Sequence, residues 1–61
     1  MKEKAIKIIE EELKLLQYRG EYLLNEMKEH SEDYTYYKHE YLVVREQIVL
    51  LREILGKIQK L

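Results

Sequence analysis

A chain of 61 residues without cysteine cannot rely on disulfides, on cysteine zinc sites or on a large core, so a partner subunit is the leading stabiliser. Its formal net charge is only −1 although 38% of its residues are charged, which argues against a strongly electrostatic binder of nucleic acid or of membranes. No apolar run approaches the roughly 18–20 residues of a membrane span, and the acidic start does not suit a signal peptide. The sequence predicts one cytoplasmic domain, residues 1–61.

The first half of the chain carries a heptad pattern that predicts a helix over residues 3–29. With Ile6 at position a, the a and d residues are Ile6, Ile9, Leu13, Leu16, Gly20, Leu23 and Met27. Apolar residues that recur every three or four positions form one face of an α-helix. The run Glu10–Glu12 fans around such a helix, so we expect it to be a solvated surface.

The segment EHSEDYTYYKHEY, residues 29–41, decides the shape of the molecule. The heptad passes through it without slipping, which is compatible with one continuous helix. Three local signals instead favour a turn at residues 30–32. Residues of low helix propensity gather there, Ser31 is a candidate N-cap, and Lys28 and Glu32 suit the end of one helix and the start of the next. We therefore predict a hairpin, with the continuous coiled coil as the alternative.

The second half continues the heptad and predicts a helix over residues 32–60. Its a and d residues, with His30 in the turn, are Tyr34, Tyr37, Tyr41, Val44, Ile48, Leu51, Leu55 and Ile58. If the chain folds back near residue 32, a and d residues whose numbers sum to 64 lie opposite one another. Gly20 then meets Val44 and leaves room for the bulky Tyr41. The predicted fold is all-α: an antiparallel two-helix hairpin with coiled-coil heptads, assembling into a homodimeric four-helix bundle or a larger helical oligomer.

This layout resembles the Rop family of plasmid regulators, two-helix hairpins of similar length that dimerise into four-helix bundles with heptads running through the turn. The resemblance covers the whole chain and lies in the residue pattern, without a shared motif, so no functional residue is carried over. It implies a homodimer, and it implies a Rop-like RNA-binding regulator as the alternative function.

No residue pattern of an enzyme or of a cofactor site stands out. His30 and His39 lie near Glu26, Glu29 and Glu40, but the Glu-x-x-His and His-Glu-x-x-His spacings of metal sites are both missing. The six tyrosines, in a chain without Phe or Trp, are interpreted as rings that fill the turn end of the bundle and keep their hydroxyls near water. We expect a non-enzymatic protein without metal or cofactor.

Three bases recur every seven residues on the second helix, namely Lys38, Arg45 and Arg52 at position e. This row could follow a phosphate backbone, so it is the candidate RNA-binding edge of the alternative function. Position e is also the usual place for interhelical ion pairs, with Glu12 and Glu26 at position g of the first helix as the expected partners. Ion pairing or a solvated edge is the preferred interpretation, and nucleic acid is not the expected partner.

The second helix carries more apolar residues than a heptad core requires. Outside positions a and d, the predicted partner-binding residues are Tyr36, Leu42, Val43, Val49 and Leu50. Either more helices surround this helix than a dimer provides, or it presents a patch to another protein. The preferred function is a small regulatory module that oligomerises through its heptads and docks a protein partner on an apolar helix face.

Overall fold

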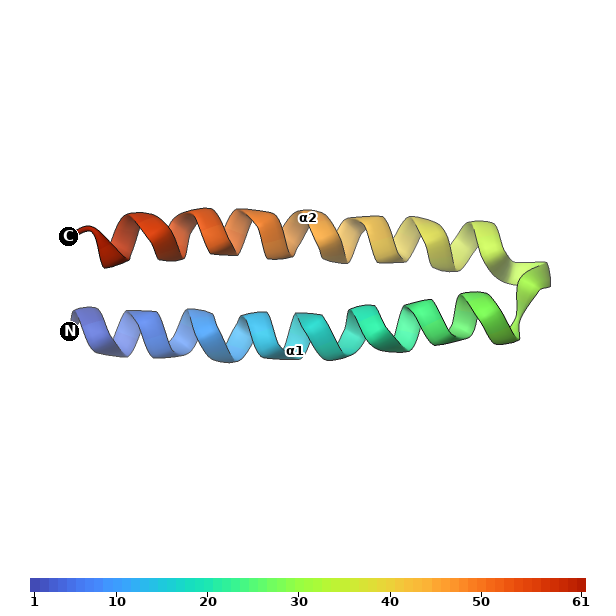
Figure 1. The fold of residues 1–61 in the computed structure, drawn as a ribbon, viewed down its shortest axis with the longest axis horizontal. Coiled ribbons are helices and arrows are strands. Elements are labelled where there is room, and N and C mark those ends of the chain that lie inside the picture. Colours follow the sequence, from blue (N-terminus) through green and yellow to red (C-terminus); the bar gives the residue numbers. More distant parts are fainter.

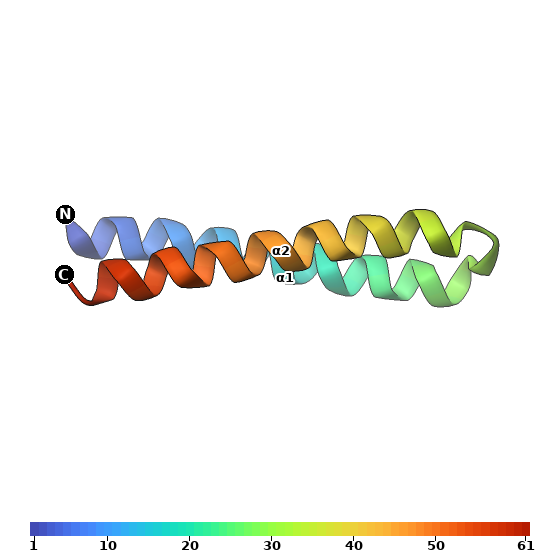
Figure 2. The ribbon, with the colours of Figure 1, turned by 90° about the horizontal axis from the view of Figure 1, so that it is seen from above.

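In the computed structural model, which describes residues 1–61, the chain forms one helical hairpin (Figure 1). Helix α1 spans Lys2–Glu29, a 3₁₀ turn η1 spans Ser31–Asp33, and helix α2 spans Tyr34–Gln59. The two helices run antiparallel and wind past each other, so that both termini lie at the same end (Figure 2). The predicted hairpin is confirmed, and the alternative of one continuous helix is wrong.

The turn is held differently from the prediction. Ser31 makes no capping hydrogen bond with its side chain, and neither helix begins with a side-chain cap. Backbone groups close the bend instead: the His30 N–H donates to the Glu26 carbonyl at 2.8 Å, and the Asp33 N–H donates to the His30 carbonyl at 3.0 Å. The first bond closes the end of α1, and the second forms the 3₁₀ turn. Because this turn comes first, α2 begins at Tyr34 rather than at residue 32.

The seam between the helices is built from the predicted a and d residues. Among these sixteen positions only His30 and Tyr34 are exposed, and the others are buried or half-buried. A Cβ placed on Gly20 would lie 3.8 Å from Val44 Cγ1 and 3.9 Å from Tyr41 Cε1. Gly20 therefore faces Val44 and gives space to Tyr41, as the predicted pairing requires.

The core is thin, because two helices alone cannot enclose it. Only three side chains are buried, those of Leu13, Leu23 and Val44. The hairpin measures 46 × 14 × 10 Å and exposes 5142 Å² of surface. A compact protein of 7.5 kDa exposes about 4,250 Å². This chain thus exposes about 900 Å² more than a compact protein of its mass.

Candidate protein-interaction surfaces

One ion pair spans the two helices and marks one side of the hairpin. Arg19 Nη2 lies 4.0 Å from Glu40 Oε2, and both side chains are partly exposed. Such a pair stabilises a protein by at most about 1 kcal/mol. Its importance is geometric, because residues three or four positions from Arg19 or from Glu40 share this side of the molecule. We call this side the Arg19 face.

The Arg19 face carries two apolar columns, one on each helix. They consist of Ile8, Leu15 and Tyr22 on α1, and of Tyr36, Val43 and Leu50 on α2. All six side chains are exposed, from 42% at Val43 to 63% at Ile8. Only the α2 column is among the predicted partner-binding residues. The α1 column occupies the same heptad position c as the α2 column, and the seven-residue spacing in the sequence already indicates it as apolar.

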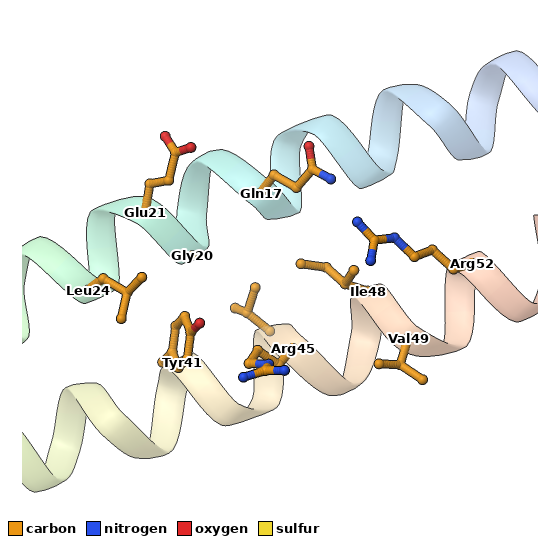
Figure 3. Close-up of a pocket in the computed structure, with 10 residues that line it drawn as sticks. Gln17, Gly20, Glu21, Leu24, Tyr41, Arg45, Ile48, Val49 and Arg52 are labelled. Atoms are coloured by element: carbon orange, nitrogen blue, oxygen red, sulfur yellow. The ribbon is translucent and has the colours of Figure 1, made fainter.

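The opposite side of the hairpin holds a shallow groove between the helices, with a volume of about 330 Å³ (Figure 3). It lies beside Gly20, where a side chain is missing, and Leu24, Tyr41 and Ile48 point into the space between the helices. Val49 lies at its outer edge. We call this side the groove face.

The five predicted partner-binding residues are all exposed, but they lie on two sides of the molecule. Tyr36, Val43 and Leu50 belong to the Arg19 face. Leu42 and Val49 lie on the groove side, where both contribute to a shallow depression with Arg45. The reason is that neighbouring residues on an α-helix are separated by about 100°. One stretch of sequence therefore supplies apolar residues to two separate surfaces.

The basic row also lies on the groove face. Arg45 and Arg52 line the groove, and Lys38 lies one heptad before them. No carboxylate is within 4.0 Å of any of the three bases, so the predicted ion pairs with Glu12 and Glu26 are wrong. The expected pairs join position e of one helix to position g of the other, which is the arrangement of parallel helices. In an antiparallel hairpin position e borders position e, and both glutamates lie on the Arg19 face.

Two bases of this row lie over tyrosine rings instead. Lys38 Nζ is 5.7 Å from the centre of the Tyr34 ring, and Arg45 Cζ is 6.0 Å from the centre of the Tyr41 ring. Contacts of this kind favour the cation by about 0.5–1 kcal/mol at exposed sites. They hold the bases along α2 without neutralising their charge.

Charge divides between the two faces. The groove face is formed by heptad positions b and e of both helices. These positions carry six bases and three acids, a net charge of +3: Lys7, Lys14, Lys28, Lys38, Arg45, Arg52, Glu3, Glu10 and Glu21. The Arg19 face is formed by heptad positions c and g of both helices. These positions carry two bases and four acids, a net charge of −2: Arg19, Lys57, Glu12, Glu26, Glu29 and Glu40. The groove face is therefore the basic side of a chain whose total charge is almost zero.

Polar contacts gather around Glu26 at the turn end. His30 lies between two carboxylates, with Nε2 3.4 Å from Glu26 Oε2 and Nδ1 3.6 Å from Glu32 Oε1. Partial burial raises the pKa of the Tyr37 hydroxyl above its ordinary value, and the charge of Glu26, which accepts the hydrogen bond from this hydroxyl, raises it further. These contacts tie the turn and the start of α2 to the end of α1.

No group of three or more His, Asp or Glu side chains is placed to hold a metal ion. Neither helix combines the length and the apolar character needed to cross a membrane. Comparison with protein-family models, with curated proteins and with solved structures found no match to this chain. The resemblance to the Rop family therefore stays one of residue pattern.

Proposed function

We propose that this chain is a small non-enzymatic interaction module, which oligomerises as a helical bundle and docks a protein partner on an apolar helix face. The observation that carries the proposal is the amount of apolar side chain exposed on a hairpin with only three buried ones. Covering an exposed aliphatic side chain favours association by roughly 1.5–3 kcal/mol before ordering costs. A few such residues are enough to hold a partner helix.

The groove face supports the docking part of the proposal. Leu24, Tyr41 and Val49 provide apolar surface along the groove. Arg45 and Arg52 stand beside them without a carboxylate partner of their own. A groove with apolar walls and a basic edge fits an amphipathic helix that carries acidic residues next to its apolar stripe. The proposed partner is a protein that presents such an acidic amphipathic helix.

We expect Leu42→Glu with Val49→Glu to eliminate binding of an acidic amphipathic helix while the hairpin stays folded. Both side chains are 50% exposed, so the new carboxylates remain in water and repel the acidic partner. The probe is a fluorescent helical peptide of Leu and Glu, and fluorescence anisotropy measures its binding while circular dichroism reports helicity. Tyr18→Glu is the matched control, since Tyr18 is 57% exposed and does not line the groove.

Two outcomes would contradict this proposal. If the double variant unfolds, Leu42 and Val49 belong to the core of an assembly rather than to a docking surface. If the double variant binds the peptide as well as the unchanged protein does, the groove face is idle surface. A peptide in which Lys replaces Glu should bind at least about tenfold more weakly, because the groove face is basic.

One observation favours RNA binding as a second candidate function, namely that Lys38, Arg45 and Arg52 form a row without ion-pair partners. An RNA complex would weaken by roughly one power of salt concentration for each phosphate contacted, and Arg45→Gln with Arg52→Gln would abolish it. We expect no retardation of structured RNA near physiological salt, because Glu46 and Glu53 directly follow the two arginines. A salt-sensitive complex at submicromolar protein would reverse this ranking.

A further inference from the structure

We propose that the Arg19 face binds a second copy of this chain in an antiparallel arrangement with two-fold symmetry. The product is a four-helix bundle whose two turns lie at opposite ends, with both groove faces left free for a partner. The inference rests on the oligomerisation included in the proposed function, and it adds the surface and the direction of the pairing.

The exposed area of the hairpin fits one such interface. The chain exposes 5142 Å², which is about 900 Å² more than a compact protein of its mass. A standard protein–protein interface covers about 800 Å² on each partner. One face covered by one further copy therefore accounts for the excess, and the six exposed residues of the two apolar columns supply the apolar part of that contact.

A symmetric dimer brings a surface against the same surface of its partner, and this condition selects the Arg19 face. On the groove face, six bases with a net charge of +3 would meet their own copies. The apolar residues there lie mainly on α2, because the facing column of α1 consists of Lys7, Lys14, Glu21 and Lys28. On the Arg19 face both helices contribute an apolar column. The Arg19 face can therefore pack against the same face of a second copy along both helices.

Charge along the hairpin decides the direction of the pairing. The turn end, residues 26–38, carries four acids and two bases, a net charge of −2: Glu26, Glu29, Glu32, Asp33, Lys28 and Lys38. The open end carries five bases and one acid, a net charge of +4: Lys2, Lys4, Lys7, Lys57, Lys60 and Glu3. A parallel dimer places each end beside its own copy, whereas an antiparallel dimer places acidic turns beside basic open ends. Unlike ends attract within the Debye length of about 10 Å.

The residue columns also match in the antiparallel arrangement. A two-fold axis at the level of Leu15 places this residue against its own copy. The same axis places Ile8 against Tyr22 of the second copy, because both lie seven residues from Leu15. Arg19 then comes close to Glu12 of the second copy, since these residues lie four after and three before Leu15. Arg19 would contact Glu40 of its own chain and Glu12 of the other.

Disulfide trapping tests this arrangement cleanly, because the chain has no cysteine of its own. Leu15 is 62% exposed, so Leu15→Cys leaves the core intact. Under mild oxidation Leu15→Cys should form a linked dimer, because a disulfide needs Cα atoms about 4.4–6.8 Å apart. Ile8→Cys alone should stay unlinked, whereas an equal mixture of Ile8→Cys and Tyr22→Cys should form a linked heterodimer.

The opposite pattern would overturn the proposal. Linking between Leu15→Cys and Leu50→Cys chains, with none for Leu15→Cys alone, would show a parallel dimer. Sedimentation supplies a second measurement: salt should weaken an antiparallel dimer by roughly tenfold between about 50 and 500 mM, because it screens unlike ends. Dimerisation that strengthens with salt contradicts the inference. A dimer without the Leu15→Cys link overturns this arrangement alone, whereas a monomer at all concentrations overturns the proposed oligomerisation as well.

Discussion

Leu23→Glu should unfold this protein. Leu23 is only 2% exposed and is the most buried side chain of the hairpin. Removing a buried leucine side chain costs about 2–5 kcal/mol, and a carboxylate without a partner in the same place adds a desolvation cost. A chain of this length is stabilised by about 3–9 kcal/mol in total. The substitution therefore consumes most or all of the stability, and circular dichroism should show loss of helix.

Leu24→Glu is the matched control for this prediction. Leu24 is the same residue type at the next position, but it is 40% exposed beside the groove, where a carboxylate stays in water. We expect a loss of less than about 1 kcal/mol there. Equal losses of helix in the two variants would mean that the burial of the seam does not hold the hairpin together.

The thermal midpoint should rise with protein concentration, by about 10 °C over a hundredfold increase. Three buried side chains are a small core for 61 residues, so we expect unfolding to be coupled to dissociation of the bundle. A hundredfold increase in concentration then stabilises the folded dimer by about 2.7 kcal/mol. Thermal unfolding followed by circular dichroism at about 5 and 500 µM measures the shift directly.

Leu15→Glu with Val43→Glu provides the comparison for this second prediction. Both residues are exposed on the Arg19 face, where the new carboxylates of two copies would repel each other. The thermal midpoint of this double variant should be lower than that of the unchanged protein, and it should no longer depend on protein concentration. If the unchanged protein has a constant midpoint and sediments as a folded monomer at micromolar concentration, the hairpin is stable alone and the bundle is contradicted.

Much of the fold could be predicted from the sequence because the seam depends on spacing along the chain. Apolar residues every three or four positions define one face of a helix whatever lies against it, and the bend at residues 30–32 then determines which residues meet. Gly20 faces Val44 for this reason. The position of the bend was predictable from residues that favour helix ends, although the backbone of η1 closes it without the Ser31 side chain.

The candidate surfaces could be predicted only in part. Exposure of Leu42, Val43, Val49 and Leu50 follows from their places outside the seam. Their division between two faces, and the α1 column that joins Val43 and Leu50, depend on where the other helix lies. The ion pairs expected for Arg45 and Arg52 failed for the same reason, because they assumed flanks that an antiparallel partner does not present.

The amino-acid sequence by itself determined that this chain is helical, which residues form the seam, and where the chain reverses. These properties follow from local propensity and from periodicity, and both depend only on residues that are close together in the sequence. The tertiary structure alone decided which columns of α1 and α2 share a side, where Arg19 and Glu40 meet, and how charge divides between the two faces. Those relations join residues far apart in the chain, and the direction in which the second helix returns sets them.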